Sequence, residues 1–159
     1  MSDDSPKPMS WDLSSARIGI VAARFNQALV DNLVEKVSQA LASYGQPESL
    51  LTLERTPGSN EIPVAASLLT NGIYDLECII TLGVVIKGST DHHHLVGQST
   101  SLALQDLSIK TEIPIINGII VTDTREQAIE RIEGTMNRGF QFANAAAEMI
   151  ELRRKWKNR

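Results

Sequence analysis

The chain has 159 residues, of which 42% are hydrophobic and 21% are charged, and its formal net charge is -4. Such a composition is typical of one soluble globular domain with a sizeable core. The slight excess of acid gives no reason to expect nucleic acid or an anionic membrane as a partner. The sequence has no signal-like N-terminus and no apolar run long enough to cross a bilayer. We therefore expect a cytoplasmic protein, and the single cysteine, Cys78, fits a reducing compartment because it cannot form an internal disulfide.

Apolar runs of strand length alternate with segments of helical periodicity along the chain. Residues 1–15, polar at first and carrying Pro6 and Pro8, are predicted to form a flexible N-terminal arm, and residues 16–159 a single domain. The expected strands are residues 17–23, 50–55, 76–85 and 113–121, and the expected helices are residues 27–44, 61–70, 91–109, 125–133 and 137–157. Because the strands are continuous apolar runs, the pattern predicts an α/β fold with a parallel sheet buried between helices on both faces.

Two of the helices carry residues that predict which side faces the core. In the first, Leu29 and Leu41 lie at the ends of an apolar stripe with a spacing of four residues. In the third, we expect an inward face formed by Leu95, Leu102, Ala103 and Leu107.

The stretch at residues 81–96 has the strongest signs of a ligand site. An apolar strand ends at Gly88, Ser89 and Thr90, and a helix follows, so free N–H groups and the positive end of a helix dipole favour an anion there. His92, His93 and His94 come next and are suited to proton transfer. The alternative interpretation of this stretch is a plain strand-to-helix connection whose histidines are solvated. A metal site is the less favoured interpretation, because consecutive side chains on a helix point about 100° apart and do not converge on one ion. The fingerprints of dinucleotide, phosphate-loop and nucleophile-elbow sites are missing.

Other polar and aromatic residues follow the remaining strands, where ligands of open α/β sheets bind. Phe25 is placed to stack on a planar ligand or to staple a helix start. Glu61 is placed to bind a ligand amide or to complement a helix N-terminus. Arg131 and Arg138 are each candidates for phosphate binding or ordinary surface charges.

Five segments at the strand ends, taken together, resemble the 6,7-dimethyl-8-ribityllumazine synthase family. They are residues 20–26 (IVAARFN), 57–66 (PGSNEIPVAA), 83–92 (GVVIKGSTDH), 122–131 (TDTREQAIER) and 137–139 (NRG). Each is weak alone, but five in the right order are specific.

The resemblance implies a three-layer flavodoxin-like sandwich whose four-stranded parallel sheet has the order 2-1-3-4. It implies condensation of 5-amino-6-ribitylaminouracil with 3,4-dihydroxy-2-butanone 4-phosphate in riboflavin biosynthesis, with release of phosphate and no cofactor or metal. It implies a homo-oligomer, a pentamer or a multiple of pentamers, with each site shared by neighbours. By the same resemblance the catalytic residues are His92, for proton transfer, and Arg131, for phosphate. The implied substrate contacts are Phe25, Asn26, Ser59, Asn60, Glu61, Val84, Val85, Ile86, Gly88, Ser89, Thr90, Asn117, Arg131 and Arg138.

The chain departs from the family pattern at three places. Asn60 and Asn117 replace aromatic residues, and His93-His94-Leu95 replaces an aromatic-Asp-aromatic sequence after the histidine. Aromatic pairs contribute about 0.5–1.5 kcal/mol each, so these losses would weaken ring binding by roughly ten-fold or more. The departures leave an alternative function open, that of a non-catalytic or altered-specificity paralogue that binds a flavin-like molecule or forms a shell. A flavodoxin-like electron carrier is a weaker alternative, because the chain lacks a hydroxyl-rich loop after the first strand.

Overall fold

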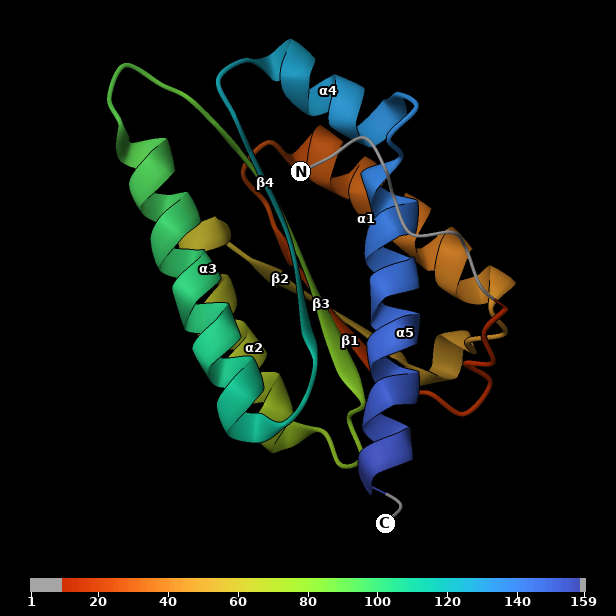
Figure 1. The fold of residues 1–159 in the computed structure, drawn as a ribbon. Coiled ribbons are helices and arrows are strands. Elements are labelled where there is room, and N and C mark those ends of the chain that lie inside the picture. Colours follow the sequence, from red (N-terminus) through yellow and green to blue (C-terminus); the bar gives the residue numbers. More distant parts are fainter. Residues whose placement is uncertain (1–9, 158–159) are drawn as a thin grey trace.

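A computed structural model describes residues 10–157 of the chain, shown in Figure 1. Within them the elements follow one another as β1 (Ile18–Ala23), α1 (Gln27–Ser43), β2 (Leu51–Thr56), α2 (Ile62–Gly72), β3 (Cys78–Ile86), α3 (His92–Thr111), β4 (Ile115–Thr122), α4 (Arg125–Glu133) and α5 (Arg138–Lys157). Two short 3-10 turns, Glu48–Leu50 and Ser59–Glu61, precede β2 and α2. The predicted alternation of strands and helices is confirmed, with boundaries that differ by at most two residues.

The four strands form one parallel sheet in the order β2-β1-β3-β4, as the resemblance implied. Ile20 of β1 pairs with Leu53 of β2 on one side and with Ile80 of β3 on the other, and Ile80 pairs with Ile116 of β4. Because all strands run the same way, their carboxyl ends meet at one edge of the sheet, where most of the predicted site residues lie.

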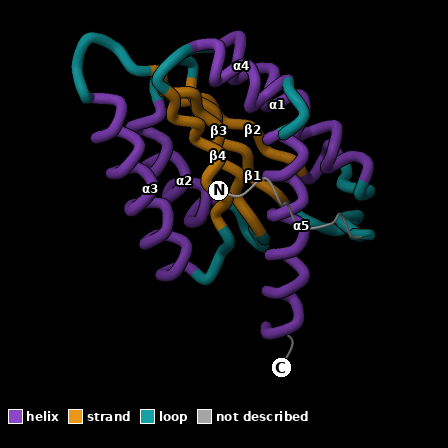
Figure 2. Tube along the Cα trace, turned by 45° about the horizontal axis from the view of Figure 1, so that its top comes forward, coloured by secondary structure: helices purple, strands orange, loops and turns teal. Residues whose placement is uncertain are grey.

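Helices cover both faces of the sheet, which makes the predicted three-layer sandwich (Figures 1 and 2). Helices α1, α4 and α5 pack on one face, over a core that includes Ile20, Ile80 and Leu82. Helices α2 and α3 pack on the other, over a smaller core with Val21 and Ile79. Successive strand residues point to opposite faces, so continuous apolar strands supply both cores.

The packed face of α3 differs from the prediction. Leu95 and Leu102 are 65% and 63% exposed, Ala103 is exposed, and only Leu107 is partly buried. The buried residues of α3 are His93, Val96, Thr100 and Leu104. The prediction was wrong because it assigned the most apolar side of the helix to the core of its own chain, whereas that side lies on the surface.

The predicted domain division, with an arm at residues 1–15, remains a prediction, because residues 1–9 lie outside the described part. Two residues near the end of that segment are packed against the domain. Leu13 is fully buried, and its N–H donates to the carbonyl of Tyr44 at 2.9 Å. The indole N–H of Trp11 donates to Asn144 Oδ1 at 2.8 Å. None of the helices in residues 10–157 is long and apolar enough to span a membrane.

Candidate functional site

Phe25 and Glu61 meet over Gly58, at the carboxyl ends of β1 and β2. A Cβ placed on Gly58 would lie 3.3 Å from Phe25 Cδ2 and 3.1 Å from Glu61 Oε2. Phe25 is 72% exposed, so its ring faces solvent rather than the core. Glu61 Oε2 accepts a hydrogen bond from the Gly58 N–H at 2.9 Å, which fixes the carboxylate beside the ring. This arrangement offers an aromatic surface for a planar ligand and a carboxylate for its polar groups.

Asn26 and Ser59 connect this corner to the end of β3. Asn26 has a left-handed backbone with φ of 54°, and its Nδ2 donates to the carbonyl of Val84 at 2.8 Å. Ser59 is buried against Gly83, where any Cβ would collide with the serine hydroxyl. The Ser59 hydroxyl is buried without a hydrogen-bond partner among the described residues. The predicted ring-binding residues therefore do come together. Asn60 lies exposed in the short turn before α2, and Val85 and Ile86 are partly buried at the end of β3.

The loop between β3 and α3 carries the predicted phosphate-binding residues Gly88, Ser89 and Thr90, all of them exposed. The backbone N–H of His92 approaches Thr90 Oγ1 at 3.5 Å, at the start of α3. His92 is exposed, whereas the next residue, His93, is 3% exposed. His92 and His93 thus have opposite surroundings although they are adjacent, and the third histidine, His94, is exposed like His92.

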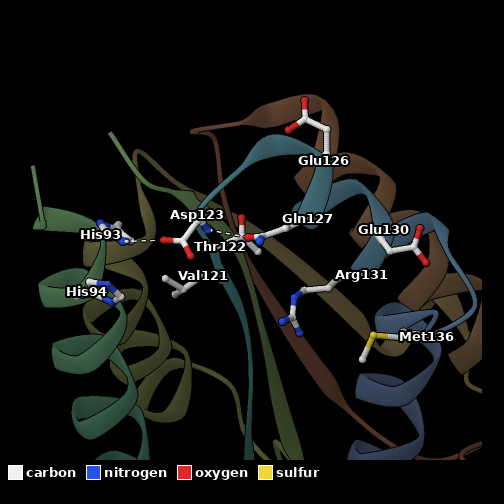
Figure 3. A pocket seen from close by; sticks show the side chains of 10 residues that line it. All are labelled: His93, His94, Val121, Thr122, Asp123, Glu126, Gln127, Glu130, Arg131 and Met136. Atoms are coloured by element: carbon white, nitrogen blue, oxygen red, sulfur yellow. Dashed lines mark hydrogen bonds and ion pairs between the residues drawn. The ribbon is translucent and has the colours of Figure 1, made fainter. Parts of the chain in front are cut away.

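A pocket of about 590 Å³ lies at the carboxyl end of β4, between the first turn of α3 and α4 (Figure 3). Arg131 reaches into it from α4, and His93 and Asp123 face each other on the opposite side (Figure 3). His92 does not line it. Its lining is His93, His94, Val121, Thr122, Asp123, Glu126, Gln127, Glu130, Arg131 and Met136.

Arg138 is close enough to Arg131 for the two charges to act on one another. Arg138 is 7% exposed and donates from Nη1 to Gln141 Oε1 at 2.7 Å. Burial lowers the pKa of Arg138 from its ordinary value, and the nearby charge of Arg131 lowers it further. An anion bound near Arg131 and Arg138 would lower the electrostatic repulsion between the two guanidinium groups, so this junction of α4 and α5 suits phosphate.

The described chain does not bring all the predicted residues to one place. Asn117 lies in the middle of the edge strand β4, where its Oδ1 accepts from the Ile119 N–H at 3.0 Å. It lines a separate cavity with Gln105 and Ser108 of α3, which includes neither Phe25 nor Arg131. One chain therefore holds the corner with Phe25 and Glu61, the pocket with Arg131, and Asn117 as three separate parts.

Two pocket residues, His93 and Asp123, were not singled out as site residues from the sequence. His93 was considered only with its neighbours, as one of three histidines suited to proton transfer and as part of a departure from the family pattern. Its place on the buried stripe with Val96, Thr100 and Leu104 follows a three- and four-residue spacing. That spacing was a usable signal for burial. Nothing in the local sequence indicated that Asp123 would face it.

No group of three or more His, Cys, Asp or Glu side chains that could hold a metal occurs among residues 10–157. Fold and site together define a flavodoxin-like α/β protein with an aromatic corner and, at the carboxyl edge of its sheet, a pocket that Arg131 shares with acidic side chains. Comparison with known proteins specifies the class further. The family model described as 6,7-dimethyl-8-ribityllumazine synthase matches residues 15–154.

Curated proteins with that same description are similar over most of the chain. The protein from Aquifex aeolicus is 46% identical over 138 residues, which cover 86% of this chain and 88% of that protein. The protein from Methylobacterium radiotolerans is 38% identical over 154 residues, covering 96% of this chain and 91% of its own length. The protein from Halorhodospira halophila is 38% identical over 144 residues, covering 89% and 91%. This chain belongs to the 6,7-dimethyl-8-ribityllumazine synthase family. The alternative of a non-catalytic paralogue is not favoured by these comparisons.

Proposed function

We propose that the chain condenses 5-amino-6-ribitylaminouracil with 3,4-dihydroxy-2-butanone 4-phosphate to give 6,7-dimethyl-8-ribityllumazine. The amino group of the pyrimidine attacks the ketone and water is lost as the imine forms. Phosphate then leaves, and the ribityl-bearing nitrogen closes the ring with loss of a second water. Membership of the family supports this reaction, and the single structural observation that carries it is the exposed Phe25 ring fixed beside the Glu61 carboxylate.

Within this proposal the residues divide the work by their chemistry. Phe25 stacks on the pyrimidine ring, and Glu61 accepts hydrogen bonds from the ribityl hydroxyls. The backbone of Val84, Val85 and Ile86 holds the ring edge, with Asn26 and Ser59 beside it. Asn60 and Asn117 occupy two positions at the edge of the ring site. No step calls for a metal or cofactor, since each is an addition, an elimination or a proton transfer.

The phosphate end of the second substrate needs positive charge and free N–H groups. Gly88, Ser89 and Thr90 supply the loop before α3, and Arg131 and Arg138 supply the charge. His92 is the general acid and base, because its imidazole is exposed beside this loop and histidine is the side chain most often used for proton transfer in catalysis.

We further propose that the site is completed between protomers of a homo-oligomer, a pentamer or a multiple of pentamers. The observation in favour is the exposed apolar side of the α2–α3 layer. Its residues Leu68, Leu95, Leu102 and Ile109 are each more than 60% exposed. An apolar surface of this kind marks an interface. In such a ring the ring-binding corner of one protomer would meet Asn117, Arg131 and Arg138 of the next. We place the enzyme in the cytoplasm, where the single reduced cysteine would persist.

The proposal is tested with His92→Ala and Arg131→Ala in the full chain. We expect both to lower kcat/KM for lumazine formation by about 100-fold or more, since proton transfer alone contributes about 10²–10⁴. Gln39→Ala, an exposed position in the second half of α1, is the control and should keep wild-type kinetics. If both variants match the control, the assigned roles are wrong.

The shared site has a separate test, because His92 and Arg131 of one chain would serve different sites. Mixing the two inactive variants and reassembling them gives some sites with both residues intact. Activity that rises on mixing supports a site built by two protomers. Activity that stays at the level of the separate variants contradicts it.

A further inference from the structure

His93 is a buried histidine whose ring nitrogens are shielded from solvent and need a hydrogen-bond partner within the protein. It is 3% exposed, and neither ring nitrogen has a hydrogen-bond partner among the described residues. Its ring lies against that of His94, with centroids 3.9 Å apart. A buried polar group without a partner is unfavourable, so a buried imidazole with two such nitrogens calls for one.

Asp123 is the acidic group that faces it. His93 Nε2 lies 3.8 Å from Asp123 Oδ1 (Figure 3). That distance is about 1 Å longer than an N–H···O hydrogen bond. The Asp123 side chain is 62% exposed, whereas that of His93 is 2% exposed. Rotation of the aspartate is therefore the movement that closes the gap, because the histidine is held by its packing.

The backbone on both sides of this pair is fixed. The Asp123 N–H donates to Gln127 Oε1 at 2.9 Å, and Thr124 caps α4 by accepting from the Gln127 N–H at 3.2 Å. On the other side, α3 approaches β4 closely, since a Cβ on Gly97 would lie 2.8 Å from Val121 Cγ2. Only rotation of the Asp123 side chain is needed to join α3 to the turn between β4 and α4.

The pair links the supports of the two proposed catalytic residues. His92 immediately precedes His93 in the first turn of α3, and Arg131 lies on α4, which begins just after Asp123. We propose that His93 is a positioning residue. Its Nε2–H donates to Asp123 and fixes the turn that carries His92 against the turn that leads to α4. This inference rests on the proposed function.

The experiment is a double-mutant cycle of His93→Phe and Asp123→Ala in the full chain. Phenylalanine keeps a ring without nitrogen, and alanine removes the acceptor. Each single change should lower kcat about ten-fold with KM altered less than about two-fold, as expected for the loss of one charge-assisted hydrogen bond. The double variant should be no slower than the slower single variant. His93→Gln and Asp123→Asn each keep a donor or an acceptor and should recover part of kcat.

Glu35→Gln is the control, because it removes a carboxylate that is exposed on α1 and does not line the pocket, and it should leave kcat unchanged. Additive effects, or no recovery in the conservative variants, would overturn the inference. Coupling seen in the free energy of unfolding but not in kcat would also overturn it, since the pair would then be merely structural. If His93→Phe does not fold, His93→Gln takes its place in the cycle.

Failure of the proposed function is recognised separately, by a wild-type protein that gives no lumazine. The same cycle is then measured by calorimetric binding of inorganic phosphate and by urea unfolding. Coupling between the two substitutions in both phosphate binding and urea unfolding would support the positioning role of His93. Additive effects in either measurement would contradict it.

Discussion

Replacing Phe25 with alanine should weaken pyrimidine binding strongly while leaving the fold intact. The ring is 72% exposed and lies beside Gly58, so its removal leaves no core cavity. We expect the free energy of unfolding to change by less than about 0.5 kcal/mol. The effect should appear in ligand affinity instead.

The magnitude follows from the exposed area of the ring. A phenylalanine side chain of about 200 Å² leaves roughly 140 Å² available at this exposure, and a stacked ligand covers about half. At about 25 cal/mol per Å², that burial contributes about 1.8 kcal/mol. Stacking adds about 0.5–1.5 kcal/mol, for a total of roughly 2–3 kcal/mol. The dissociation constant of the Phe25→Ala variant should therefore rise about 30- to 150-fold.

Calorimetry with the ribitylaminouracil measures this directly, and urea unfolding checks the fold. Phe25→Leu is the control, since it keeps apolar area and loses only stacking, so its affinity should fall about two- to ten-fold. Unchanged affinity in Phe25→Ala would show that the ring only staples the start of α1. A loss of unfolding free energy above about 2 kcal/mol would show that it belongs to the core.

Three further predictions concern the scaffold. Burial raises the pKa of Tyr44, whose hydroxyl lacks a partner among the described residues. The contribution of the neutral hydroxyl to the free energy of unfolding is therefore complete below pH 10, and it is lost as the pH rises through the higher pKa of the folded state. Tyr44→Phe should thus flatten the alkaline fall in the free energy of unfolding, and an unchanged alkaline slope would contradict this. Gly97→Ala should destabilise the protein by about 1 kcal/mol or more in urea, because the new Cβ meets Val121, and a gain of stability would refute the close packing of α3 on β4. Burial raises the pKa of Cys78, so a thiol reagent should react only after unfolding, and rapid labelling of the native protein would be the contrary result.

The sequence predicted the elements well because each carries its own periodicity and stop signals. The helix at Arg125–Glu133 was predicted at its observed bounds, since Thr124 and Gln127 form the capping box seen in the structure. The strand order came from the resemblance and not from the residues, because nothing local specifies which strands are neighbours.

The site could be predicted only in part. The strand-end rule brought Phe25 and Glu61 to the same corner, because carboxyl ends of parallel strands share an edge. The burial of His93 was missed, since it depends on which side of α3 meets β4. The exposed side with Leu95 and Leu102 misled that prediction, because a single chain does not reveal whether an apolar stripe faces its own core or another surface.

The measurement that tests the central claim most directly is a steady-state assay of the wild-type chain. The ribitylaminouracil and the butanone phosphate are mixed with the protein, and lumazine absorbance and phosphate release are followed together. We predict a rate well above the protein-free background, with equal amounts of lumazine and phosphate formed, and its loss in His92→Ala. A rate equal to background from a folded protein that binds the ribitylaminouracil would contradict the proposed synthase activity.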